Sequence, residues 1–168
     1  MKPIVSIIMG STSDLKIMEK AAAFFDEMEI PFEINALSAH RTPAAVEEFA
    51  RGAQQRGIKV VIAAAGMAAA LPGVIAANTC LPVIGVPIAS SFDGMDALLA
   101  IVQMPPGIPV ATVAVNGALN AAILALQILA QSDEAAATKL AAYKEGLKAK
   151  IEKANRDLAE VKYKFKTN

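Results

Sequence analysis

The middle of the chain is almost free of charge, and this feature constrains the fold more than any other. Between residues 60 and 132 there are 73 residues and only two formal charges, Asp93 and Asp96, whereas the other 95 residues carry the remaining thirty. A membrane span needs about 20 unbroken apolar residues. Six prolines and several glycines divide this stretch into shorter pieces, so we expect no membrane partner.

Helices in this stretch would lack the charged outer face that a surface helix normally carries. Such helices are expected around 68–80, 93–103 and 117–131. A monomer of 168 residues could not enclose so much uncharged helix. We therefore expect these helices to be buried between the subunits of a closed homo-oligomer.

The length and the overall charge favour one domain, 1–168, that acts on a small ligand. Sixteen basic and sixteen acidic side chains cancel, which predicts neither nucleic acid nor an anionic membrane as a partner. The only cysteine, Cys80, cannot form an internal disulfide, and the N-terminus lacks the apolar core and cleavage site of a signal peptide. We expect a cytoplasmic protein.

Strand-like and helix-like segments alternate along the chain. Short apolar runs predict strands at 3–10, 32–37, 58–65, 81–88 and 108–115, and helical patterns fall at 15–29, 43–57, 68–79, 93–104, 117–132 and about 133–162. The helix at 43–57 has Thr42 at its cap position, Pro43 in its first turn and Gly57 after its end. Such alternation predicts an α/β fold, with a parallel sheet between two helical layers.

A sheet of this kind binds ligands outside the carboxyl ends of its strands. The loop "GSTSD" follows the first strand. Gly10 permits a tight exit, and the hydroxyls of Ser11, Thr12 and Ser13 stand at a helix start that favours anions. Plain helix capping explains these residues equally well, and neither a Walker lysine nor a G-x-G-x-x-G pattern is present.

Two further loops meet the same edge. In "SAHRTP", His40 is the only histidine and can carry a proton near neutral pH, and Arg41 offers a planar fork of donors for a phosphate. By composition alone, a structural histidine and a solvated arginine are the commoner interpretation. In "AAGMAAALPG", Gly66 and a run of alanines would leave a small dry space for a flat ligand, with close helix packing as the alternative.

Taken together, these stretches resemble the PurE family of purine biosynthesis, the 5-(carboxyamino)imidazole ribonucleotide mutases. The similarity runs through "MGSTSD", "SAHRTP", "AAGMAAALPG", "LPVIGVP", "DALLAIVQMPPGIPVATVAV" and "NAAILALQIL", over about residues 4–131. It implies a flavodoxin-like, three-layer fold, a homo-octamer with sites at subunit boundaries, and no metal or organic cofactor. The implied activity is an isomerase that moves a carboxylate from the exocyclic nitrogen to the adjacent ring carbon, giving 4-carboxy-5-aminoimidazole ribonucleotide.

The resemblance also implies roles for individual residues. His40 would be the general acid and base, Arg41 would hold the phosphate, and Asp14 would accept bonds from ribose hydroxyls. The remaining substrate-binding residues expected from it are Gly10, Ser11, Ser13, Ser38, Ala39, Gly66, Met67, Ala68, Ala70 and Leu71. Carbon dioxide, released and recaptured during the transfer, would be confined by the glycine and alanine loop.

The chain departs from the family in one loop. Members usually read "AGGAAHLPG", so that Met67 stands in place of a glycine and Ala70 in place of a second histidine. Reduced activity is therefore one expectation. A carboxylase that adds free carbon dioxide to aminoimidazole ribonucleotide is an alternative function, and a non-catalytic flavodoxin-like module is a more distant one.

Overall fold

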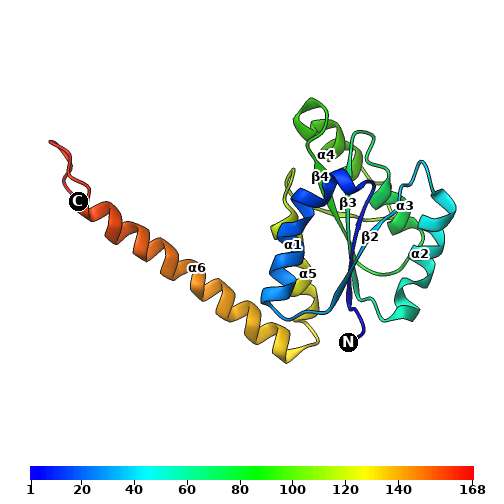
Figure 1. Ribbon diagram of the computed structural model, residues 1–168, viewed down its shortest axis with the longest axis horizontal. Coiled ribbons are helices and arrows are strands. Elements are labelled where there is room, and N and C mark those ends of the chain that lie inside the picture. The colour runs from blue at the N-terminus through cyan, green and yellow to red at the C-terminus, as the bar shows by residue number, and fades with distance from the viewer.

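The computed structural model describes residues 1–168 and alternates strands with helices (Figure 1). The strands are β1 (Val5–Met9), β2 (Phe32–Ala36), β3 (Val60–Gly66), β4 (Val83–Ile88) and β5 (Ala111–Thr112). The α-helices are α1 (Leu15–Glu27), α2 (Pro43–Arg56), α3 (Leu71–Ala77), α4 (Met95–Val102), α5 (Ala118–Leu129) and α6 (Glu134–Glu160). Two turns of 3-10 helix, η1 (Thr12–Asp14) and η2 (Phe92–Gly94), precede α1 and α4.

All strand pairs are parallel, and the strand order is β2-β1-β3-β4-β5. This is the flavodoxin-like order, so the predicted three-layer α/β fold is confirmed. The chain passes from β1 to β2 on one side and returns to β3 on the other, with Ile7 opposite Ile34 and Ile62. The order therefore reverses at β1, and the crevice that this reversal creates lies at the carboxyl ends of β1 and β3.

Apolar side chains cover both faces of the sheet. Successive residues of a strand point to opposite faces, so Ile7 packs in the core beneath α1 and α5, while Ile8 packs beneath α2, α3 and α4 (Figure 1). The central strands β3 and β4 are buried along almost their whole length. This explains why their sequences are continuous apolar runs rather than alternating ones.

Helix α6 starts on the body of the molecule and then leaves it (Figure 1). Tyr143 packs edge-on against Phe24 with ring centroids 5.1 Å apart. Lys139 donates hydrogen bonds to the carbonyl oxygen of Met28 and to the carboxylate of Glu29, both at 2.8 Å. Farther along, Ile151 is 65% exposed. The outer half of α6 therefore has no packing partner within its own chain, although most helices depend on such packing.

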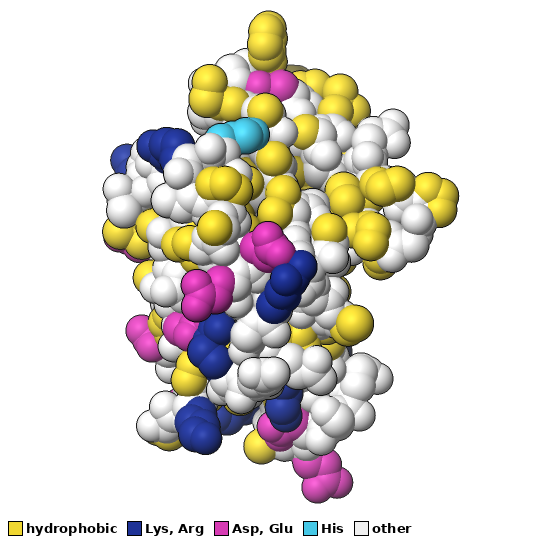
Figure 2. All heavy atoms as spheres, turned by 90° about the vertical axis from the view of Figure 1, so that its right-hand side faces the viewer, with side chains coloured by type: hydrophobic (Ala, Val, Ile, Leu, Met, Phe, Trp, Pro, Cys, Tyr) yellow, Lys and Arg dark blue, Asp and Glu magenta, His cyan; other side chains and the backbone are white.

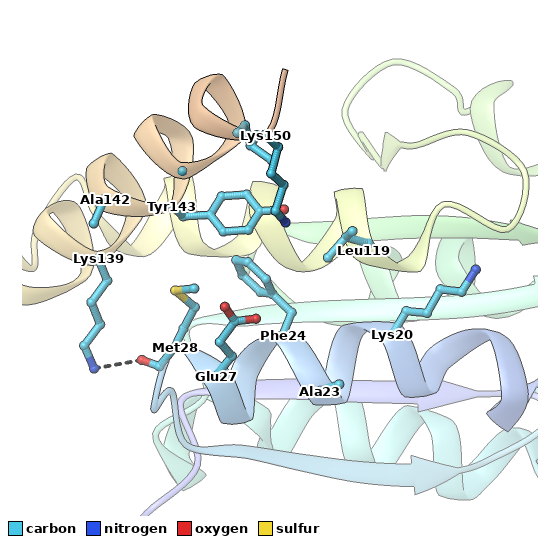
Figure 3. A pocket seen from close by; sticks show the side chains of 12 residues that line it. Lys20, Ala23, Phe24, Glu27, Met28, Leu119, Lys139, Ala142, Tyr143 and Lys150 are labelled. Carbon is cyan, nitrogen blue, oxygen red and sulfur yellow. Dashed lines mark hydrogen bonds between the residues drawn. The ribbon is translucent and has the colours of Figure 1, made fainter. Parts of the chain in front are cut away.

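A hollow of about 720 Å³ opens where α6 leaves α1 and α5 (Figure 3). It lies on the outer side of this helical layer, and Phe24, Tyr143, Lys20 and Lys150 are among its lining residues. It contains none of the residues that the sequence singled out for a site. None of the helices combines the length and apolar character needed to cross a bilayer.

Several predicted elements are longer than the observed ones, and the backbone explains three of the differences. The strand expected at 108–115 is only the two residues of β5. Pro109 precedes it and has no N–H to donate, and the chain turns away at 114–117, where Gly117 N bonds to the oxygen of Ala114. The helix expected at 68–79 is α3, which starts at Leu71 because Met67 and Ala69 have positive φ. The helix expected at 93–104 is α4, which starts only at Met95 because Asp93 and Gly94 have left-handed backbone angles.

Candidate active site

A cavity of about 630 Å³ lies at the carboxyl ends of the strands, where the order reverses. The loops after β1, β2 and β3 line it, together with one residue that follows β4. It brings together all thirteen residues predicted from the sequence: Gly10, Ser11, Ser13, Asp14, Ser38, Ala39, His40, Arg41, Gly66, Met67, Ala68, Ala70 and Leu71. Residues up to 61 positions apart in sequence thus line one cavity. Their individual roles stay predictions.

The loop after β1 forms a tight turn of hydroxyl groups. The Ser11 hydroxyl accepts a hydrogen bond from the backbone N–H of Ser13 at 3.3 Å and so caps η1. The Ser13 hydroxyl donates to the carboxylate of Asp14 at 3.2 Å. Burial raises the pKa of Asp14, and the bond from Ser13 opposes this only in part. Capping thus explains Ser11, while Asp14 presents a partly desolvated acceptor to the cavity.

The loop after β2 is a turn that closes on itself. Thr42 N donates to the oxygen of Ser38 at 2.8 Å. The Thr42 hydroxyl accepts from Ser38 N and donates to the same Ser38 oxygen, both at 3.0 Å. His40 lies within this turn, exposed and without a hydrogen-bond partner in the chain. The turn therefore presents an unpaired imidazole on a fixed backbone.

This turn corrects one prediction about α2. Thr42 occupies the cap position and Pro43 starts the helix, as expected, and Gly57 ends it in a left-handed conformation. The Thr42 side chain does not cap the helix, however. Its hydroxyl is used by Ser38 instead, so the residue stabilises the loop that carries His40.

Arg41 joins two of the loops. Its Nη2 donates to the carbonyl oxygen of Gly10 at 2.8 Å, and its Nε donates to the Ser38 hydroxyl at 3.3 Å. Nη1 has no partner in the chain, so the guanidinium is held in place while part of its donor fork remains available. An arginine fixed in this way suits an anion such as a phosphate.

The end of β3, the loop after it and the start of α3 form an apolar wall. Ala65, Met67, Ala68, Ala69, Ala70 and Leu71 line the cavity with no polar side chain among them. Met67 has a φ of 56° and Ala69 a φ of 43°, both in the left-handed region that favours glycine. The backbone is therefore strained at Met67, where the PurE family usually has glycine.

Ser90 is the lining residue with a functional side chain that the sequence analysis missed. It follows β4, and a Cβ placed on Gly66 would lie 2.5 Å from its hydroxyl oxygen. A side chain at residue 66 would therefore force the Ser90 hydroxyl to rotate away. Only the rule that all four carboxyl ends share one edge could have pointed to Ser90, because its sequence neighbourhood contains no motif.

The cavity lies at the weakly charged end of the molecule. Figure 2 shows most charged side chains of one face on its lower half, whereas the upper end is mostly hydrophobic or uncharged, with a few charged side chains near the histidine and at the top. No Phe or Tyr side chain lines the cavity, so the planar stacking partners of a flavin are missing. No three His, Cys, Asp or Glu side chains gather into a metal-binding group.

Comparison with known proteins identifies the family. The sequence profile described as AIR carboxylase matches residues 4–150. The chain belongs to the AIR carboxylase family. This confirms the resemblance to the PurE proteins, which are members of it, and argues against a non-catalytic flavodoxin-like module.

Individual relatives agree with this assignment. N5-carboxyaminoimidazole ribonucleotide mutase from Pyrococcus horikoshii is 53% identical over 161 residues, which cover 95% of this chain and 91% of that protein. Phosphoribosylaminoimidazole carboxylase from Saccharomyces cerevisiae is 54% identical over 83% of this chain, but the match spans only 24% of that longer protein. The crystal structure of Treponema denticola PurE has a TM-score of 0.84 at 32% identity, covering 93% of this chain and 98% of that one.

Proposed function

We propose that this protein is an N5-carboxyaminoimidazole ribonucleotide mutase, an isomerase of purine biosynthesis. The observation that carries the proposal is a single cavity lined by an unpaired imidazole, a hydrogen-bonded guanidinium and an apolar wall, within a chain of this family. A phosphorylated, planar and carboxylated substrate requires these three kinds of surface. The mutase name of relatives at about half identity over most of the chain supports it.

His40 is the proton carrier in this proposal. Protonated His40 gives its proton to the exocyclic nitrogen as the N–C bond to the carboxyl group breaks and carbon dioxide is released. The ring carbon then forms a new C–C bond to the carbon dioxide, and neutral His40 removes the proton from that ring carbon. One imidazole thus returns to its starting state, and the unpaired side chain is free for this work.

The other groups hold the substrate. Arg41 takes the phosphate with help from the hydroxyls of Ser11, Ser13 and Ser38, and Asp14 accepts from the ribose hydroxyls. The wall from Gly66 to Leu71 confines carbon dioxide, which offers little for polar groups to bind, and keeps water away from it. The reaction in this form calls for no metal or organic cofactor.

The missing imidazole at position 70 leads us to expect reduced turnover. Ala70 is a lining residue at the start of α3, so a histidine there would add a side-chain donor to an otherwise apolar wall. His40 remains available without it. The defect is therefore partial rather than complete.

Assembly into a homo-octamer is part of the proposal, although the number eight rests only on the family resemblance. Phe92, Met95, Leu99 and Val102 are exposed on or next to α4, with Phe92 at 83%. Single subunits rarely expose contiguous apolar surface of this kind. Sedimentation at micromolar concentration is expected to give a closed oligomer, and a stable monomer would contradict this part.

The activity is tested by incubating the purified protein with two substrates. Turnover of the carboxyamino nucleotide without added bicarbonate supports the mutase. Turnover of aminoimidazole ribonucleotide with bicarbonate, but not of the carboxyamino nucleotide, would instead support the carboxylase that the yeast relative's name suggests. A cytoplasmic location remains our prediction and is tested by cell fractionation.

A further inference from the structure

We propose that the Ser90 hydroxyl binds the carboxylate of the nucleotide, as a substrate-binding residue on the β4 side of the cavity. The inference rests on the proposed function and extends it to a residue that the sequence motifs do not include. It assigns to Ser90 a ligand of one chemical class, a carboxylate attached to the imidazole.

The distribution of polar groups around the cavity is one-sided. The loops after β1 and β2 supply Ser11, Ser13, Asp14, Ser38, His40 and Arg41. The stretch from the end of β3 to the start of α3 supplies seven residues, Ala65 to Leu71, with no polar side chain. The segment after β4 supplies Ser90. A substrate whose phosphate is held by Arg41 and whose other end reaches the β3–β4 side therefore meets a single polar side chain there.

The Ser90 hydroxyl is also the one hydroxyl in its segment without a structural task. Ala89 N donates to the side-chain oxygen of Asn116 at 3.0 Å, and the Ser91 hydroxyl donates to the Asp96 carboxylate. These bonds fix the backbone on both sides of Ser90. Its own hydroxyl has no partner in the chain, and it lies against Gly66, where an added Cβ would come within 2.5 Å of the oxygen.

The close approach of Gly66 places this hydroxyl at the apolar wall. A serine hydroxyl can donate one hydrogen bond and accept others. Its natural ligand at this place is an anionic oxygen, because Asp14 on the opposite side already supplies an acceptor for hydroxyl groups. The carboxylate that moves during the reaction is the group of the substrate that needs a donor, and the side chain of Ala70 provides none.

The test compares the binding of two nucleotides that differ only in the carboxylate. Dissociation constants of 4-carboxy-5-aminoimidazole ribonucleotide and of aminoimidazole ribonucleotide are measured by calorimetry for the wild type and for Ser90→Ala. Loss of a hydrogen bond to a charged group is expected to weaken binding of the carboxylated nucleotide by roughly 10- to 150-fold. The affinity for the nucleotide without the carboxylate is expected to stay within about twofold, since that nucleotide has no group that bonds to Ser90.

Two control variants keep the result specific. Ser90→Thr retains the hydroxyl and is expected to bind the carboxylated nucleotide more tightly than Ser90→Ala. Ser132→Ala removes an exposed serine far from the cavity and should change neither constant. A fold defect in Ser90→Ala would weaken the binding of both nucleotides, whereas a lost carboxylate contact weakens the binding of the carboxylated nucleotide alone.

The outcomes separate this inference from the proposed function. If the wild type binds both nucleotides and Ser90→Ala weakens both equally or neither, the role of Ser90 is wrong and the proposed function stands. If the wild type binds neither nucleotide, both are wrong. Selective weakening of the carboxylated nucleotide, with recovery in Ser90→Thr, supports the inference.

Discussion

Arg41 donates a hydrogen bond from Nη2 to the carbonyl oxygen of Gly10, at 2.8 Å. Gly10 follows β1 and Arg41 follows β2, so this bond ties together two loops that are separated by the whole of α1. The same guanidinium reaches the Ser38 hydroxyl through Nε. Its orientation is therefore set before any ligand arrives, and little side-chain entropy remains to be lost on binding.

Replacing Arg41 by alanine is expected to weaken nucleotide binding by roughly 10- to 150-fold, since hydrogen bonds to charged groups contribute about 1.5–3 kcal/mol each. The nucleotide affinity of Arg41→Lys should lie between those of the wild type and Arg41→Ala, because lysine keeps the charge but loses the planar fork of donors. Arg51→Ala is the matched control, as Arg51 is exposed and pairs with Glu47 at 2.6 Å outside the cavity. Equal dissociation constants for Arg41→Ala and Arg51→Ala would refute a phosphate role.

His40→Asn is expected to lower kcat for the carboxyamino nucleotide by at least about 100-fold, the lower end of the effect of a general acid or base. His40 is exposed and makes no bond within the chain, so the circular dichroism spectrum, oligomeric state and nucleotide affinity should hardly change. Near-normal kcat in this variant would mean that another group moves the proton.

Asp14→Asn should make the protein more stable at neutral pH and bind nucleotide less well. Burial raises the pKa of Asp14 above its usual value of 3.8, so the folded chain disfavours the carboxylate. The resulting loss in the free energy of unfolding is absent at pH values well below 3.8 and complete at pH values above the raised pKa. In urea unfolding, Asp14→Asn should therefore have a higher free energy of unfolding than the wild type at pH 7, and the two should not differ at about pH 3. A difference of the same size at both values would contradict this cause.

Met67→Gly is expected to raise the free energy of unfolding by up to about 1 kcal/mol. A left-handed residue other than glycine costs roughly 1–2 kcal/mol, and the greater freedom of glycine in the unfolded chain offsets part of the gain. The side chain of Met67 is 64% exposed, so little packing is lost. Met67→Ala keeps the Cβ and the strain, and should not stabilise. Equal denaturation midpoints for the two variants would argue against strain at this residue.

Ala70→His is expected to raise turnover of the carboxyamino nucleotide by about 5- to 150-fold, the range for a regained hydrogen-bond donor in a dry site. Ala70 has right-handed helical backbone angles, which a histidine adopts without strain. The melting temperature and oligomer should be unchanged. If the rate and the affinity both stay the same, position 70 acts only as spacing, or a water molecule supplies the bond.

Most of the candidate site could be predicted because its residues follow strands whose carboxyl ends must share one edge. Gly10, Ser38 and Gly66 each stand directly after an apolar run, and their convergence follows from a parallel sheet alone. The crossing of the Arg41 side chain to Gly10 could not be predicted, because it depends on the shape of the turn from Ser38 to Thr42.

Other features depended on tertiary context. Thr42 has the sequence signal of a helix cap, but its hydroxyl bonds to Ser38 because the turn brings the two together. Ser90 gives no signal, since one serine after a strand is ordinary. The length of the C-terminal helix agrees with its pattern, whereas its departure from the body could not be derived, because periodicity fixes a face and not the partner of that face.

The two-residue strand β5 bears on how the protein can aggregate. An open sheet edge offers unpaired backbone groups on which a strand from another chain can add. Here the edge offers only Ala111 and Thr112, and Pro105, Pro106 and Pro109 in the preceding segment cannot donate to a ladder. Growth of the sheet from molecule to molecule is thereby blocked on this side, which leaves side-chain surfaces such as that of α4 for orderly contacts between copies.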